Sequence, residues 1–90
     1  MAKRDRQLEQ IVKGFANHRR IQIMRLLSRN PHLSVQQIAR SLRINYKTAS
    51  EHIRRTTMAG LTTKRSHDRW VRHKLTKRGR IVLTFLRTLE

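Results

Sequence analysis

Apolar residues recur at helical spacing at the start of the chain, where four of them stand at i, i+3, i+4 and i+7: Leu8, Ile11, Val12 and Phe15. This spacing predicts an amphipathic helix over residues 4–16. Asn17 suits the N-cap of a second helix, because its side chain can accept hydrogen bonds from the first free backbone amides. Apolar positions in that helix cover more than one stripe, so we expect a central helix contacted from two sides. It should end before Pro31, since the residue preceding proline disfavours the helical region, and residues 31–33 should form a short extended connector.

The segment from Ser34 to Leu61 has the pattern of a helix, a tight turn and a second helix. Ser34, followed three residues later by Gln37, is a capping-box pattern that marks a helix start. Asn45 can cap the second helix, and Gly60 is placed for its C-terminal left-handed cap. The buried face of this second helix is thin: Ala49, Ile53 and Thr56. Its remaining faces are polar and basic.

Beyond residue 61 the pattern changes to period two, with Val71, His73 and Leu75 on one face and Trp70, Arg72 and Lys74 on the other. This alternation predicts a basic β-hairpin over 61–75, with its turn near residues 67–69. Thr76 can cap a last helix over 77–89, whose apolar stripe is Ile81, Val82, Phe85, Leu86 and Leu89. The sequence therefore predicts one domain over residues 1–90 that is mainly α, with a small β-hairpin.

The charge of the chain is strongly positive, with 22 Lys and Arg against 5 Asp and Glu and a formal net charge of +17. Such an excess attracts polyanions, so nucleic acid is the first candidate partner and an anionic membrane the second. No apolar run approaches the roughly 18 to 20 residues that a spanning helix needs. Residues 1–6 are too charged to begin a signal peptide. We therefore expect a cytoplasmic, nucleoid-associated protein with no membrane partner.

Four stretches, in this order, resemble the ArsR-like branch of winged-helix transcriptional regulators: FANHRRIQIMRLL, LSVQQIARSLRINYKTASEHI, MAGL and KLT. The resemblance runs from about Phe15 to Thr76. It implies a winged helix-turn-helix fold, with the helix-turn-helix at 34–59, the wing at 61–75 and a possible short first strand in the connector. Two positions depart from the family pattern: Arg43 stands where the turn often has glycine, and Thr56 where the recognition helix often has leucine.

The resemblance also implies a homodimer, in which the flanking helices 4–16 and 77–89 pack across a two-fold axis. The expected dimer residues are Leu8, Ile11, Val12, Phe15, Phe85, Leu86 and Leu89. Family members repress transcription and release DNA on sensing a metal or another signal. The chain has no cysteine, so the thiolate metal site is excluded, and the last helix has no His or Asp for an alternative metal site. We therefore predict no metal, no cofactor and no small-molecule effector.

Candidate readers of DNA lie on the second helix of the pair, opposite Ala49 and Ile53: Tyr46, Lys47, Ser50, Glu51, Arg54 and Arg55. Lys47 can reach guanine acceptors or a phosphate, and Ser50 a base edge or a phosphate. Glu51 can either accept from cytosine N4 or pair with Arg55 one turn away, and the ion pair is favoured.

The predicted wing offers Lys64, Arg65, Ser66, His67 and Arg69 to the DNA backbone or the minor groove. The start of the last helix offers Lys77, Arg78 and Arg80 to phosphates. Trp70 either covers the base of the sheet or stacks on a DNA sugar, and packing is favoured.

Three histidines suggest specific roles. His73 is expected to be a hydrogen-bonded core residue rather than a metal ligand with His67. His52 flanks the reading face, and its protonation below about pH 6.5 would tighten DNA binding.

The sequence favours a sequence-specific, double-stranded DNA-binding transcriptional regulator, expected to be a dimeric repressor that acts by occupying its operator. The five acidic residues are scattered and no Gly-rich phosphate loop is present, so we predict no enzyme. The main alternative is a nucleoid architectural protein of low sequence preference. Two further alternatives are weaker. An RNA-binding protein would have Tyr46 and Trp70 as its stacking residues, and a protein-interaction module would more often expose apolar anchors.

Overall fold

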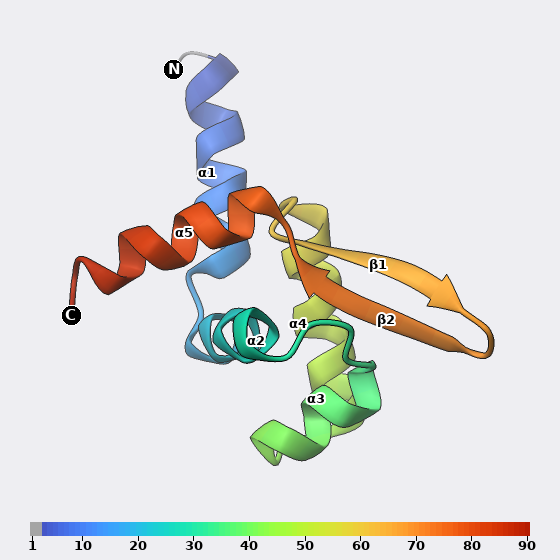
Figure 1. Ribbon diagram of the computed structural model, residues 1–90. Coiled ribbons are helices and arrows are strands. Elements are labelled where there is room, and N and C mark those ends of the chain that lie inside the picture. Colours follow the sequence, from blue (N-terminus) through green and yellow to red (C-terminus); the bar gives the residue numbers. More distant parts are fainter. Residues whose placement is uncertain (1–2) are drawn as a thin grey trace.

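The computed structural model describes residues 3–90, which form five helices and one antiparallel hairpin (Figure 1). In chain order these are α1 (Lys3–Phe15), α2 (His18–Arg29), α3 (Val35–Leu42), α4 (Tyr46–Met58), β1 (Thr62–His67), β2 (Trp70–Leu75) and α5 (Lys77–Arg87). The predicted class, mainly α with a small hairpin, is confirmed.

Each helix from α2 to α5 begins at the cap residue that the sequence indicates. The Asn17 side chain accepts from the amides of Arg19 and Arg20 at 2.9 and 3.2 Å. Ser34 and Gln37 form a reciprocal capping box. The Asn45 side chain accepts from the Lys47 and Thr48 amides, and Thr76 Oγ1 accepts from the Gly79 amide. Such caps satisfy amides that have no partner inside the helix, so they fix where each helix starts.

The core is built around α2, which contacts α1, α3, α4, α5 and β2. Its Ile23, Met24 and Leu27 are 0 to 1% exposed, and they pack with Ile38 of α3, Ile53 of α4 and Leu83 of α5. Burying one such side chain stabilises a fold by about 1.5 to 3 kcal/mol. The expected central helix is confirmed, and the two elements that flank the turn, α3 and α4, are both fixed to it.

The connector at residues 31–33 forms an isolated bridge rather than a strand. Leu33 pairs with His73: the His73 amide donates to the Leu33 carbonyl at 2.8 Å, and the His32 amide donates to the His73 carbonyl at 2.9 Å. Pro31 has no amide to donate, and His32 has a positive φ of 70° that turns the chain. These features limit the predicted first strand to one bridge.

The hairpin extends away from the helices, as Figure 1 shows for β1 and β2. Thr62 is paired with Leu75 at its base and His67 with Trp70 at its tip, so Asp68 and Arg69 form a two-residue turn. Thr62 and Leu75 are buried, whereas the residues near the tip are exposed. The hairpin is therefore fixed at one end and open to solvent at the other.

Both departures from the family pattern have a structural consequence. Arg43 ends α3 in the left-handed conformation, with φ 55° and ψ 45°, which costs an L-residue about 1 to 2 kcal/mol. Thr56 is fully buried, and its hydroxyl donates to the Ile53 carbonyl at 2.8 Å and lies 2.8 Å from Thr62 Oγ1. The hydroxyl therefore links α4 to the first residue of β1, where leucine would make only apolar contacts.

No helix within residues 3–90 is long and apolar enough to cross a membrane.

Candidate nucleic-acid interface

The inner face of α4 is buried and its outer face is open to solvent. Ala49, Ile53 and Thr56 are at most 2% exposed. Five of the six predicted reader residues are exposed and Ser50 is half-buried: Tyr46, Lys47, Glu51, Arg54 and Arg55. The sequence pattern therefore places the polar face of this helix correctly, and the reading role of these residues remains a prediction.

Glu51 binds two arginines on the outer face of α4. Its carboxylate accepts from Arg54 Nη2 at 2.6 Å and Arg54 Nε at 3.0 Å, and from Arg55 Nε at 3.1 Å. These hydrogen bonds, first from Arg54 and then from Arg55, lower the pKa of Glu51 to about 2. The predicted pair with Arg55 is confirmed, but the two-point pair with Arg54 was missed. A cytosine amino group would therefore compete with two arginines for this carboxylate.

The hairpin brings one predicted wing residue, Lys64, beside α4. Lys64, Arg65, Ser66 and Arg69 are exposed, while the side chain of His67 lies outside the described part of the chain. A groove of about 460 Å³ separates the hairpin from α4, and Tyr46, Ser50, Arg54 and Lys64 are among the residues that line it. The structure thus brings three predicted readers and one wing lysine to the same groove.

The basic residues at the start of α5 are exposed, but two of them also hold the fold together. Arg78 Nη1 donates to the Ala59 carbonyl at 3.1 Å, and Arg80 Nη1 donates to the Leu75 carbonyl at 3.3 Å. These contacts fix the end of α4 and the end of β2 to α5. The expected phosphate contacts of Lys77, Arg78 and Arg80 remain predictions, and the structural role of the two arginines was not predicted.

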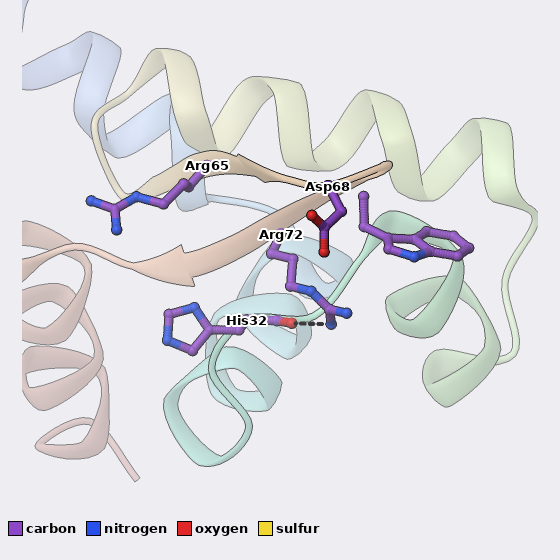
Figure 2. Close-up of a pocket in the computed structure, with 5 residues that line it drawn as sticks. His32, Arg65, Asp68 and Arg72 are labelled. Atoms are coloured by element: carbon purple, nitrogen blue, oxygen red, sulfur yellow. Dashed lines mark hydrogen bonds between the residues drawn. The ribbon is translucent and has the colours of Figure 1, made fainter.

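Trp70 is 51% exposed, so the expectation that it packs over the base of the sheet is wrong. It lies at the tip of the hairpin, opposite His67, in the last residue pair before the turn. Arg72 is the next residue on the same face of β2. Its Nη1 donates to the His32 carbonyl at 3.1 Å, as Figure 2 shows. This hydrogen bond holds the hairpin to the connector between α2 and α3.

His73 is buried as expected, but its predicted hydrogen bonds are absent. The residue is 4% exposed, and neither ring nitrogen has a hydrogen-bond partner within residues 3–90. Burial, and secondly the charge of Lys64, lower the pKa of His73. His73 is opposite Lys64 in the hairpin and His67 is opposite Trp70, so the two histidines belong to different cross-strand pairs. Among the described residues, no three His, Asp or Glu side chains are grouped so that they could hold a metal ion.

His52 forms a hydrogen bond with α2, and its expected role as a pH-dependent DNA contact remains a prediction. Arg20 Nε donates to His52 Nδ1 at 3.2 Å, and Arg20 Nη1 donates to the Lys13 carbonyl at 2.9 Å. Burial, and secondly the charge of Arg20, lower the pKa of His52. Protonation would therefore occur at a lower pH than expected and would remove the acceptor that Arg20 uses.

The expected dimer residues divide into two groups. Leu8, Val12, Phe85 and Leu89 are 49 to 67% exposed. In contrast, Ile11, Phe15 and Leu86 are half-buried against the core of the same chain. Ile81, which the expected set omits, is 60% exposed and precedes Phe85 and Leu89 by one and two helical turns. The exposed apolar residues of the two flanking helices are therefore Leu8 and Val12 on α1 and Ile81, Phe85 and Leu89 on α5, called the apolar set below.

Comparison with known proteins identifies relatives of this arrangement. The model of the bacterial regulatory protein arsR family matches residues 17–64, more than half of the chain. No curated protein matches the sequence.

Solved structures share the whole fold. HlyU from Vibrio cholerae N16961 is 27% identical with a TM-score of 0.83, and the match covers 99% of this chain and 97% of that one. The homodimeric winged helix-turn-helix DNA-binding domain of a possible ArsR-family transcriptional regulator from Mycobacterium bovis has a TM-score of 0.86 at 22% identity, covering 99% of this chain and 86% of that one. A Staphylococcus aureus MepR–DNA complex has a TM-score of 0.77 at 16% identity, covering 96% and 74%. The winged helix-turn-helix fold is thereby confirmed.

Proposed function

The chain belongs to the bacterial ArsR family of regulatory proteins, and we propose that it is a dimeric repressor that binds a specific double-stranded DNA operator and acts by occupying it. In this proposal α4 enters the major groove and reads base edges. The hairpin and the start of α5 hold phosphates. A DNA ligand would place the protein at the nucleoid, in the cytoplasm.

The observation that carries this proposal is the pairing of a polar, exposed helix face with a basic hairpin across one groove. The outer face of α4 carries Lys47 beside Tyr46 at its first turn, and Ser50 follows one turn later. Residues near the N-terminus of a recognition helix are the ones that contact base edges. Lys64 faces the same groove from β1. This arrangement would let a single duplex contact the helix and the wing together.

The apolar set supports a dimer. Its five side chains are each about half exposed or more, and they lie on α1 and α5, outside the helix-turn-helix. A second copy of the chain would remove such large apolar side chains from water. The M. bovis neighbour is described as homodimeric. A two-fold dimer would present two copies of α4 to half-sites about 34 to 36 Å apart.

The net charge of +17 supports a second candidate, an architectural protein that binds duplexes with little sequence preference. Counterion release by many Lys and Arg residues gives affinity without sequence information. Affinity measured at one salt concentration would not separate the two candidates.

Selection from a random duplex pool at about 150 mM salt separates them, because this salt concentration weakens non-specific phosphate binding. We expect enrichment of an inverted repeat with half-sites about 10 to 11 base pairs apart, centre to centre. Tight binding without any enriched sequence would favour the architectural protein. Absence of duplex binding at low salt would contradict both candidates.

A further inference from the structure

The groove between α4 and the hairpin has the size of a small-molecule site. It measures about 460 Å³, within the range of roughly 300 to 1,000 Å³ that is usual for such sites. Its walls come from the start of α3, one stripe of α4 and the face of the hairpin that carries His73. Besides Tyr46, Ser50, Arg54 and Lys64, it is lined by Val35, Ile53, Thr57, Met58, Val71 and His73.

Part of this groove is apolar and exposed to water. Ile53 is buried and Val35 half-buried, whereas Tyr46, Met58 and Val71 are 41 to 69% exposed. An apolar ligand would release the water that covers these three side chains. Tyr46 and Met58 favour an aromatic ligand in particular, because aromatic rings pack edge-to-face on one another and a thioether sulfur contacts ring edges.

The groove is also positively charged. Lys64 and Arg54 line it, and none of the described residues that line it is Asp or Glu. Arg54 is already held, because Glu51 accepts from its Nε and Nη2, and Met58 Sδ accepts from its Nη1 at 3.1 Å. In contrast, Lys64 forms no ion pair with a carboxylate in residues 3–90. The Lys64 ammonium is therefore open to an anionic ligand.

His73 adds a buried polar group without a partner. It lines the groove and is the cross-strand neighbour of Lys64. The residue is 4% exposed, and neither ring nitrogen has a hydrogen-bond partner among the described residues. Because burial lowers the pKa of His73, the ring is neutral at pH 7 and carries one donor and one acceptor. A carboxylate beside Lys64 would supply an acceptor for that donor.

We propose that this groove binds a small aromatic carboxylate and that the bound molecule excludes DNA. The aromatic ring packs against Tyr46 and Met58. The carboxylate binds the Lys64 ammonium and accepts from the imidazole of His73. The expectation that no effector binds was drawn from metal-ligating residues alone, and it did not extend to a site whose walls come from three elements.

The exclusion of DNA rests on the proposed function, whereas binding of the carboxylate does not. Four residues that line the groove are also predicted DNA contacts: Tyr46, Ser50, Arg54 and Lys64. A molecule in the groove covers these side chains, so it competes directly with a duplex. The ligand would therefore act on DNA binding at the reading face itself, without a change of fold.

The first measurement tests ligand binding in the absence of DNA. Naphthoate is titrated into the full, isotope-labelled chain, and the backbone amide signals are followed by NMR. Acetate offers the charge without the rings, and naphthamide the rings without the charge. Lys64→Gln removes the cation, and Val71→Phe fills the groove with a side chain. Lys74→Gln is the matched control, because Lys74 is an exposed lysine on the opposite face of the same hairpin.

We expect naphthoate to shift the amide signals of α4 and of the hairpin around Lys64 and His73, with a dissociation constant of about 1 mM or lower. Replacing naphthoate by naphthamide, or Lys64 by Gln, should each weaken binding about five-fold. Val71→Phe should abolish binding, and Lys74→Gln should retain it. The dispersion of the amide signals shows whether each variant is folded.

The second measurement tests competition with DNA. A labelled duplex of mixed sequence, about 25 base pairs long, is titrated with the chain and followed by anisotropy at constant ionic strength. Naphthoate at five times its dissociation constant should raise the apparent Kd of the duplex about six-fold for each groove that must be empty. The same concentration of acetate should leave the Kd unchanged.

The two measurements separate failure of this inference from failure of the proposed function. The groove is not a carboxylate site if naphthoate leaves the amide signals of α4 and the hairpin unchanged, or if folded Lys64→Gln binds it as tightly as Lys74→Gln does. If naphthoate binds in the groove and the duplex affinity stays constant, the exclusion of DNA is wrong. If the duplex does not bind at low salt, the proposed function and the exclusion of DNA both fail, and the first measurement still decides the site.

Discussion

Replacing His73 by a side chain without polar atoms should stabilise the protein. The imidazole is 4% exposed and neither of its nitrogens has a hydrogen-bond partner in the described part of the chain. A buried polar group without a partner costs about 1 to 3 kcal/mol. His73→Leu has a similar volume and His73→Phe keeps a flat ring, so each should retain the packing and remove this cost. The backbone bridge between His73 and Leu33 is independent of the side chain.

The same substitution should change how stability depends on pH. Burial holds the pKa of His73, and of His52, below the ordinary value of the side chain. Below about pH 6.5 the unfolded chain therefore binds protons that the folded chain does not, and stability falls as pH falls. Each histidine contributes a slope of at most about 1.4 kcal/mol per pH unit in that range. Above about pH 7 this contribution is complete and constant.

Urea unfolding followed by circular dichroism, at steps between about pH 5 and pH 8, measures both effects. Protein concentration must be held constant, because a dimer is stabilised by mass action. At neutral pH we expect the variants to gain about 1 to 2 kcal/mol. Their loss of stability toward pH 5 should be smaller than that of the wild type. His18→Gln serves as the control, since His18 is an exposed histidine at the start of α2.

The reasoning would be refuted by a loss of stability at neutral pH in both the Leu and the Phe variant. That result would mean that the imidazole nitrogens are satisfied in solution. A slope equal to that of the wild type in both variants would refute the assignment of proton uptake to His73.

Three further changes test the caps, the charges and the dimer. Arg43→Gly should raise the free energy of unfolding by up to about 1 kcal/mol, because glycine adopts the left-handed conformation at φ 55° without strain. A lower midpoint of thermal unfolding in the variant would contradict this. Glu51→Gln should release Arg54 and Arg55, so affinity for random duplex should rise several-fold while discrimination between DNA sequences falls, and a weaker affinity of the variant would contradict the reasoning. Because the pKa of Glu51 is about 2, the wild-type affinity should show no titration of this group between about pH 4 and pH 8. Phe85→Glu should yield a folded monomer in sedimentation experiments, since Phe85 is 53% exposed. A variant that remains dimeric would show that Phe85 is not part of the interface.

The helix boundaries could be predicted from the sequence because they depend on local chemistry. Asn17, Ser34, Asn45 and Thr76 each cap the helix that follows them, and a cap needs only its own amides. Gly60 adopts the left-handed conformation for a similarly local reason, with φ 74°. The polar outer face of α4 followed from helical periodicity, which depends on spacing within one element.

The contacts that the sequence did not reveal join residues far apart in the chain. The hydrogen bonds from Arg72 to His32, from Arg20 to His52 and from Arg78 to Ala59 span 40, 32 and 19 positions. Arginine reaches many acceptors, so no local pattern indicates which carbonyl or ring nitrogen it binds. The exposure of Trp70 was missed for a related reason, because alternation assigns a residue to a face but does not show whether a second layer covers that face.

The sequence also did not show which apolar residues of the flanking helices are buried in the core and which are exposed. A helical stripe predicts that Phe85 and Leu86 face away from solvent, but a dimer and a core use neighbouring parts of one stripe. Leu86 packs on the core and Phe85 is exposed. Ile11 is among the expected dimer residues, so it would be a natural target for breaking the dimer. Because Ile11 packs against the core, a charge there would disturb the fold itself. Exposed positions such as Val12 and Phe85 separate the two effects.

The placement of the acidic residues bears on whether the protein reads sequence or merely binds charge. Between residues 40 and 80 the chain has thirteen Lys and Arg but only two acidic residues, Glu51 and Asp68. Both are exposed, on the outer face of α4 and at the hairpin turn. A carboxylate on a DNA-binding surface weakens attraction to every duplex equally, and an architectural protein would gain nothing from it. Glu51 also holds Arg54 by two hydrogen bonds and Arg55 by a third, which restricts where these guanidinium groups can point. Restricting these arginine donors lowers the affinity for DNA of any sequence and favours the base pairs whose acceptors match the positions of the donors. The carboxylate on α4 therefore favours a sequence-specific reader despite the net charge of the chain.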